Sequence, residues 1–105
     1  MRRTARSSSI DCATKLKILS DPTRLSVMEI LLAGSKHVGE INSVLRVEQS
    51  LLSHHLKVLR EAGLVRAERD GKAVRYSLAE QVGGNRAEKA INLGCCHLTF
   101  EEIAS

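Results

Sequence analysis

The chain has 105 residues, which is enough for one small domain and little more. Its 16 Lys and Arg residues against 12 Asp and Glu give a formal net charge of +4, and the sequence pI of about 9.3 suits a polyanionic partner. One Phe, one Tyr and no Trp exclude an aromatic platform for single-stranded nucleic acid, and no apolar run approaches the length of a membrane span.

The first nine residues, MRRTARSSS, are basic and rich in serine, and we expect a flexible tail over residues 1–9. They lack the apolar stretch of a secretory signal, so we expect a cytoplasmic protein in a reducing compartment. The three cysteines, Cys12, Cys95 and Cys96, are then expected as thiols. Their odd number argues against a structural disulfide framework and leaves thiol reactivity and metal binding open.

Two helices are predicted at the start of the domain, which we place at residues 10–94. Apolar residues recur at helical spacing from Ile10 onward and predict the first helix. Asp21 and Pro22 begin the second, because Asp caps unpaired amides and Pro is preorganised at the first helical position. Arg24 is interpreted as surface charge. The residues expected to face the core are Ala13, Leu16 and Leu19 in the first helix and Leu25, Met28, Leu31 and Leu32 in the second.

A helix-turn-helix is predicted in the middle of the chain. Val38 to Leu45 is a short helix, and a tight turn at Arg46 to Glu48 leads into a longer helix from Gln49 to Gly63. His55 is the one polar residue on the apolar side of the longer helix. The residues expected to pack inward are Ile41, Val44 and Leu45 in the short helix and Leu51, Leu52, Leu56, Val58, Leu59 and Ala62 in the longer one.

The opposite arc of the longer helix is entirely polar, and it consists of Gln49, Ser50, Ser53, His54, Lys57, Arg60 and Glu61. These residue types read nucleic acid, since Gln can pair with the edge of adenine and cations contact phosphates. Alone, such an arc is typical of a solvated helix face. Its place in a helix-turn-helix favours the DNA-binding interpretation.

A basic β-hairpin follows, from Leu64 to Leu78. Apolar residues alternate with polar ones on both sides of an Asp70-Gly71 link, which is a strong hairpin signal. The cations around its tip are Arg66, Arg69, Lys72 and Arg75. A helix-turn-helix followed by a basic hairpin predicts a winged helix whose wing meets the DNA backbone or minor groove.

A last helix is predicted from Arg86 to about Leu93, after the break at residues 83–85, with Gly94 ending or interrupting it. Its expected apolar side consists of Ala87, Ala90, Ile91 and Leu93. Residues 95–105 form a short cysteine-containing segment. The predicted fold is therefore mostly α, with about five helices and a two-stranded wing.

Three motifs in this order, LKILSDPTRLSVMEILL, SHHLKVLREAGLV and RDGKAVRYSL, resemble the ArsR-SmtB family of bacterial metal- and redox-responsive repressors. The resemblance covers roughly Leu16 to Leu78. It implies a homodimeric winged helix whose first and last helices form the dimer interface. It also implies binding to a palindromic operator in double-stranded DNA and release by an inducer.

The motif match assigns roles residue by residue. Gln49, Ser50, Ser53 and His54 would face the major groove, Lys57 would supply a cation for phosphates, and Arg69, Lys72 and Arg75 would serve the wing. His55 is expected to be buried and hydrogen-bonded. Two residues depart from the family pattern: Glu48 replaces a usual Ser or Thr cap, and Leu51 replaces a common small polar residue. His37 receives no role.

The family resemblance leaves one region for inducer sensing. The helix before the recognition helix, VGEINSVL, lacks the cysteine box of some relatives, and the zinc-sensing Asp/His and His/Glu pairs are also missing. Cys95, Cys96 and His97 remain, together with Cys12. Three thiolates would form a trigonal site for arsenite or antimonite, and His97 would complete a tetrahedral site for a soft divalent metal.

Other interpretations of the cysteines remain open. Cys12 could pair with Cys95 or Cys96 under oxidant or reactive sulfur, as a redox or persulfide switch. The thiols could also be simple buried apolar residues. A thiol-dependent enzyme is disfavoured because the chain has no C-x-x-C motif, and a winged helix that binds protein instead of DNA is a further alternative. No cofactor is expected to be required for folding.

Overall fold

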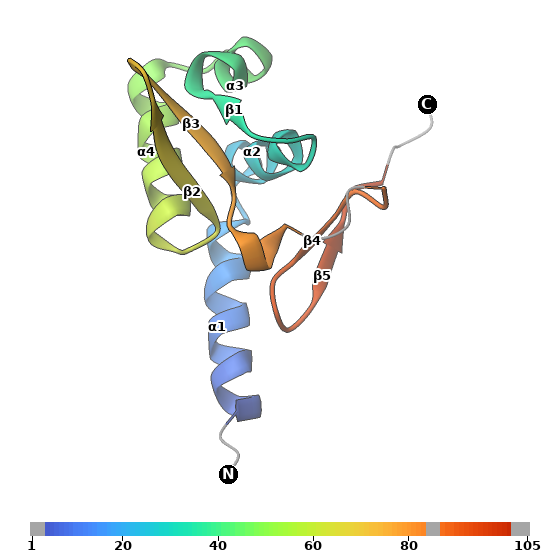
Figure 1. Cartoon of the computed structure of the whole chain (residues 1–105). Coiled ribbons are helices and arrows are strands. Elements are labelled where there is room, and N and C mark those ends of the chain that lie inside the picture. The colour runs from blue at the N-terminus through green and yellow to red at the C-terminus, as the bar shows by residue number, and fades with distance from the viewer. Residues whose placement is uncertain (1–3, 84–86, 102–105) are drawn as a thin grey trace.

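The computed structural model describes residues 4–83 and 87–101. Four α-helices and a basic wing form the body (Figure 1), which confirms the mostly α winged-helix fold. The helices are α1 (Thr4–Ile18), α2 (Pro22–Leu32), α3 (Val38–Leu45) and α4 (Gln49–Glu61), with a 3-10 helix η1 (Glu80–Val82). The strands are β1 (Lys36–His37), β2 (Val65–Asp70), β3 (Ala73–Leu78), β4 (Ala90–Asn92) and β5 (His97–Thr99). Among the described helices, none is long and apolar enough to cross a membrane.

The start of α2 is as predicted from Asp21 and Pro22. The Asp21 carboxylate accepts hydrogen bonds from the amides of Thr23 and Arg24, at 2.8 and 3.1 Å. Backbone hydrogen bonding to Arg24 lowers the pKa of Asp21, so the cap stays ionised at neutral pH. Pro22 occupies the first turn, where its missing amide costs nothing.

The turn between α3 and α4 is held by a side chain. Asn42 donates from its amide nitrogen to the carbonyl of Val47 at 3.0 Å and accepts from the Val47 amide at 2.9 Å. Arg46 adopts a left-handed φ of 56° at the end of α3. These contacts fix the angle at which α4 leaves the turn.

The wing is a three-stranded sheet with the order β1-β3-β2. In its register Val65 lies opposite Leu78 and Ala67 opposite Tyr76, so the apolar residues share the face that packs on the core. The two linking residues are Gly71 and Lys72, one position later than the predicted Asp70-Gly71 link. Residues 36–37, expected in a loop, instead form β1 against β3.

The core is built from α2, α3, α4, the wing and the segment after it. The buried apolar residues include Val27, Met28, Ile41, Leu52, Leu56, Leu59, Leu64, Val82 and Ile91. Among the described residues, the large apolar side chains that are exposed instead are Ile10 (64%), Leu16 (41%), Val44 (63%) and Leu51 (45%). The predicted inward positions of Leu16, Val44 and Leu51 are therefore wrong, and so is that of Ala13, which is also exposed.

Two predicted boundaries also differ. The first helix begins at Thr4, six residues before Ile10, while residues 1–3 lie outside the described part. The predicted helix from Arg86 to Leu93 is wrong from residue 87 onward, and Arg86 itself lies outside the described residues. Its place is taken by the β4–β5 hairpin.

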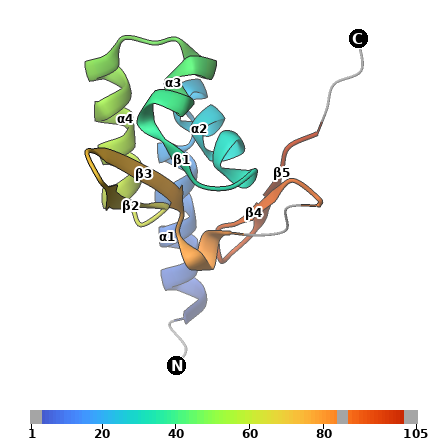
Figure 2. The ribbon, with the colours of Figure 1, turned by 45° about the horizontal axis from the view of Figure 1, so that its top comes forward.

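Two residues with left-handed backbone angles flank β4 and prevent a continuous helix here. Lys89 and Gly94 have positive φ angles, of 54° and 93°, one before β4 and one after it. The amide of Leu93 donates to the carbonyl of Cys96 at 2.8 Å and closes the turn. Ala90, Ile91 and Leu93 are buried as expected, whereas Ala87, which was expected on the same apolar side, is exposed. Figures 1 and 2 both show this hairpin beside the middle of the molecule, near α1.

Candidate nucleic-acid interface and thiol cluster

The outward face of α4 carries the predicted reading residues. Gln49, Ser50, Ser53, His54 and Lys57 are all exposed. The opposite side of the helix is buried through Leu52, His55, Leu56 and Leu59. Packing of that side against the core therefore holds the polar face toward solvent.

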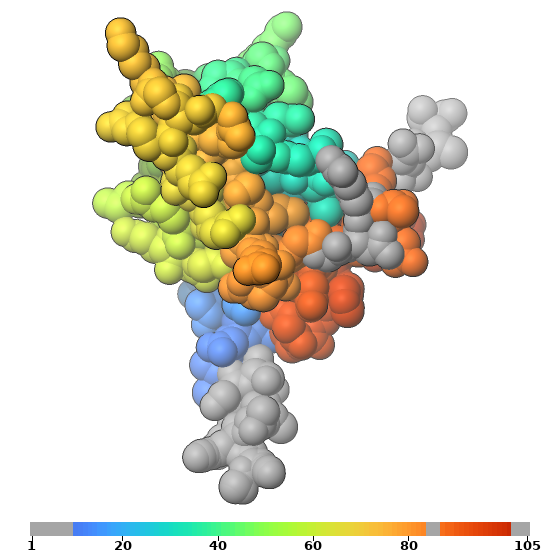
Figure 3. All heavy atoms as spheres, viewed as in Figure 1, coloured from blue at the N-terminus to red at the C-terminus, as the bar shows by residue number. Residues whose placement is uncertain are grey.

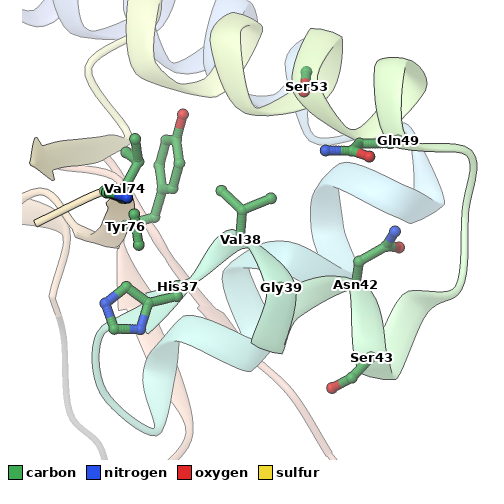
Figure 4. Close-up of a pocket in the computed structure, with 11 residues that line it drawn as sticks. His37, Val38, Gly39, Asn42, Ser43, Gln49, Ser53, Val74 and Tyr76 are labelled. Atoms are coloured by element: carbon green, nitrogen blue, oxygen red, sulfur yellow. The ribbon is translucent and has the colours of Figure 1, made fainter. Parts of the chain in front are cut away.

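A groove of about 720 Å³ lies between α3, the start of α4 and the wing. Figure 4 shows Gln49 and Ser53 on the α4 side of this groove, Asn42 and Ser43 on α3, and Tyr76 on the wing. Lys72, at the tip of the wing, also lines it. The two elements expected to meet DNA, α4 and the wing, thus border one open space together with α3.

The wing cations differ in how they are engaged. Arg69 and Lys72 are exposed, whereas the half-buried Arg75 forms an ion pair with Asp70. Arg75 is thus already paired within the protein, and its predicted DNA contact would compete with that pair. Arg69 and Lys72 remain exposed cations on the wing.

His37, which received no role from the sequence, joins the wing to α3. Its Nε2 lies 2.8 Å from Oδ2 of Asp70, and its backbone amide donates to Oε1 of Glu40 at 2.8 Å. Two hydrogen bonds hold the pKa of Asp70 below its ordinary value: the bond with His37 has the larger effect, and the bond with Arg75 has the next largest. The sequence could not predict this contact because Asp70 is 33 residues away.

His55 is buried and hydrogen-bonded, as expected, with 6% of its surface exposed. Its Nδ1 lies 3.0 Å from Nη1 of Arg24. Because a guanidinium can only donate, Nδ1 is the acceptor and the neutral ring carries its proton on Nε2. Arg24 also donates from Nε to the carbonyl of Ile18 at 2.7 Å. The interpretation of Arg24 as surface charge is therefore wrong: it bridges α1 and α4.

Three sulfur atoms meet where α1 passes the β4–β5 turn. Cys12 is bonded to Cys95 in a disulfide with a Cα–Cα separation of 6.0 Å. The Sγ of Cys96 lies 3.7 Å from that of Cys12 and 3.8 Å from that of Cys95. We call these three residues the thiol cluster. All of its sulfurs lie within 4.8 Å of one another.

A further contact ties the thiol cluster to the fold. Lys15, one turn after Cys12, donates from Nζ to the carbonyl of Leu93 at 3.2 Å. Figure 3 shows the orange-red surface of the hairpin against the blue surface of α1. His97 is exposed in β5 and, among the described residues, is not part of the cluster. The sequence analysis named all three cysteines of the cluster as a candidate ligand set. It placed Cys95 and Cys96 after a helix, whereas the structure places them in a hairpin turn.

The cluster offers two kinds of chemistry. In the disulfide form, Cys96 is the remaining thiol. In a reduced form, three thiolates about 2.3 Å from one soft ion would lie roughly 4 Å apart in a trigonal arrangement. Two of the three sulfur separations, 3.7 and 3.8 Å, already match that arrangement. The residues present therefore fit a three-sulfur ligand set better than one that includes His97.

Comparison with known proteins places residues 21–67 in the family described as "Bacterial regulatory protein, arsR family". The biofilm growth-associated repressor of Agrobacterium fabrum is 38% identical over 85 residues, which are 81% of this chain and 73% of that protein. A cadmium resistance transcriptional regulatory protein, the CadC homolog of Staphylococcus aureus, is 32% identical over 82% of this chain and 72% of its own. Reduced HlyU from Vibrio cholerae superposes with a TM-score of 0.69 at 33% identity, over 75% of this chain and 83% of that one.

Proposed function

Because the chain belongs to the ArsR family of bacterial regulatory proteins, we propose that it is a homodimeric repressor that binds a palindromic operator and releases it when its thiols react. The observation that carries the DNA-binding part is the exposed polar face of α4 beside a basic wing. A recognition helix with this composition enters the major groove and reads base edges.

The DNA contacts divide into reading and positioning groups. Gln49, Ser50, Ser53 and His54 would contact base edges, while Lys57, Arg69 and Lys72 would contact phosphates. Gln49→Ala should therefore change which sequences are preferred. Lys72→Ala should weaken binding to all sequences and reduce the salt dependence of the dissociation constant. Equal losses on every sequence from both variants would contradict this assignment.

The dimer is supported by α1. Its exposed apolar residues Ile10 and Leu16 form a surface that a second copy could cover, and the small core gains from such pairing. Two copies related by a two-fold axis would present two α4 helices to half-sites about one helical turn of DNA apart, roughly 34 Å. This arrangement requires a palindromic operator.

We propose arsenite, antimonite or a related soft metal as the inducer, bound by Cys12, Cys95 and Cys96. The proximity of the three sulfurs supports this ligand set. The name of the CadC homolog also places a cadmium resistance regulator among the relatives. Binding would join α1 to the hairpin through metal–sulfur bonds in each protomer.

A second candidate is a redox switch, and the Cys12–Cys95 disulfide specifically favours it. Oxidation would remove two electrons and two protons from the Cys12 and Cys95 thiols, and the oxidant would accept them. A cellular dithiol would reverse the step. This candidate also joins α1 to the hairpin, but it needs only two of the three cysteines.

Either chemistry could reach α4 through Arg24. Cys12 of the thiol cluster lies on α1. The carbonyl of Ile18 at the end of α1 accepts from Nε of Arg24, whose Nη1 binds His55 of α4. A shift of α1 would therefore disturb a partly buried hydrogen bond of the recognition helix. This is a physical connection from the cysteines to the operator-binding face.

The test is operator release from the reduced protein, titrated in parallel with arsenite, zinc, diamide and a persulfide donor. Cys96→Ser separates the candidates, because it removes one of three metalloid ligands but leaves Cys12 and Cys95 able to form their disulfide. Loss of the arsenite response in Cys96→Ser supports the metalloid site. A diamide response kept in Cys96→Ser and lost in Cys12→Ser supports the switch. Release unchanged in both variants would contradict a sensing role for the thiol cluster.

A further inference from the structure

Leu51 is an exposed apolar residue at the edge of the polar face of α4, next to His54. It is the third residue of α4, and 45% of its surface is exposed. The other leucines of the same helix, Leu52, Leu56 and Leu59, are buried. The core therefore does not explain why position 51 is apolar.

The position of Leu51 places it within reach of base edges. His54 lies three residues later, so the two side chains are neighbours on the helix surface. Leu51 also lies in the first turn, and the N-terminal residues of a recognition helix are the ones that contact bases. Figure 1 shows the start of α4 at the end of the molecule that carries the tip of the wing.

The hydrogen bonds around Leu51 fix its backbone and leave its side chain to interact with a ligand. Its amide donates to the carboxylate of Glu48 at 3.0 Å, which anchors the first turn. Its side chain carries no polar atom, so its contribution to base reading must be apolar. In the major groove the one apolar group on a base edge is the 5-methyl group of thymine.

We propose that Leu51 is a specificity-determining residue that contacts a thymine methyl group in each operator half-site. This inference rests on the proposed DNA-binding function and deepens it. His54 would read a hydrogen-bonding group, whereas Leu51 would read a methyl group beside it. The contact would favour thymine over cytosine and over uracil at one position in each half-site.

The test uses a duplex selected from a random pool by the reduced, full-length chain. Each thymine is replaced in turn by deoxyuridine, which removes the methyl group and keeps the base pairing. For the wild-type chain, one thymine position in each half-site should be sensitive to this change. Replacing the single thymine at such a position should weaken binding about fourfold, which is the contribution expected from burying one methyl-sized group. Leu51→Ala should bind the thymine duplex and the deoxyuridine duplex equally, and Leu51→Met should keep the preference for thymine.

Val44→Ala is the matched control, because Val44 is also an exposed apolar residue but lies on α3. It should keep the discrimination between thymine and deoxyuridine. Equal binding of every deoxyuridine duplex by the wild-type chain, or discrimination that survives in Leu51→Ala, overturns the inference while leaving DNA binding intact. Failure to enrich any duplex from the pool overturns the proposed function as well.

Discussion

Glu48 shows how one residue can serve the fold and oppose the function. It replaces the hydroxyl cap that resemblance to the family leads one to expect, yet its carboxylate accepts hydrogen bonds from Ser50 and from the amide of Leu51. The Ser50 hydroxyl, and then the Leu51 amide, hold the pKa of Glu48 below its usual range. The cap is therefore ionised at neutral pH, next to Gln49 and Ser50, which are proposed to contact base edges of the polyanionic operator.

Two substitutions at Glu48 should separate these effects. Glu48→Ser keeps an N-cap and removes the negative charge. Because the phosphates would then repel the protein less, its affinity for DNA of any sequence should rise about threefold. Glu48→Ala removes charge and cap, so its urea midpoint should fall below that of Glu48→Ser. Fluorescence anisotropy measures the DNA affinity, and urea unfolding measures the stability. Weaker DNA binding by a stably folded Glu48→Ser would contradict the prediction.

Asp70 should make the wing sensitive to acid. Hydrogen bonds from His37 and Arg75 lower its pKa from the ordinary value of 3.8, so its stabilising contribution is present above that value. The contribution is lost as the pH falls through the lower folded-state pKa. Asp70→Asn should therefore be less stable than the wild type at neutral pH, with the difference in the free energy of unfolding narrowing as the pH falls below 3.8.

Urea unfolding across this pH range tests the effect of Asp70. Glu68→Gln is a suitable control, because it removes an exposed carboxylate of the same wing strand and should leave the acid dependence unchanged. A constant difference between wild type and Asp70→Asn at every pH would show that the Asp70 charge is not responsible.

The roles of single residues were predictable when they depended on local spacing. Helical periodicity was sufficient to predict the exposure of Gln49, Ser53 and Lys57 and the burial of His55. The roles of Arg24 and His37 were missed, because each depends on a partner more than 30 residues away. A sequence pattern carries no signal for such a contact.

At the scale of elements, predictions succeeded where several local signals agreed. The start of α2 has both Asp21 and Pro22, and the wing has alternation on both sides of a glycine turn. The segment after residue 86 has only a short apolar run, which fits a helix and a strand equally well. The structure resolves that ambiguity through the turn at Gly94, which brings Cys95 and Cys96 to Cys12.

Gly94 should therefore be required for assembly of the thiol cluster. Its φ of 93° is a conformation that a side chain disfavours, so Gly94→Ala should destabilise the hairpin by about 1 kcal/mol or more. The rate of Cys12–Cys95 disulfide formation under mild oxidation should fall, as measured by mass spectrometry of alkylated protein.

Gly39→Ala is the control for Gly94→Ala. Gly39 lies in α3 with open space around its Cα, so alanine there should be neutral or stabilising by up to about 1 kcal/mol. It should leave the rate of disulfide formation unchanged. Equal rates for wild type and Gly94→Ala would show that the hairpin turn does not position the cysteines.

At the scale of the whole molecule, α1 connects two sites. The thiol cluster holds one side of α1 to the β4–β5 hairpin, and Arg24 holds its C-terminal end to α4. Figure 1 shows α1 extending from the body on the side opposite the tip of the wing. A change at the cysteines can therefore affect operator binding through the elements that α1 and the hairpin contact, or through the second copy in the proposed dimer.

Arg24 should be required for the first of these routes. In Arg24→Met, the ratio of operator affinities between reduced and oxidised protein should move toward one, because α1 and α4 no longer share a hydrogen-bonded residue. His55 would lose its donor, so stability should also fall by about 1–3 kcal/mol. The double variant Arg24→Met/His55→Leu removes both partners of the bond and should recover part of that stability without recovering the affinity ratio. An unchanged ratio in folded Arg24→Met would show that the coupling does not pass through Arg24.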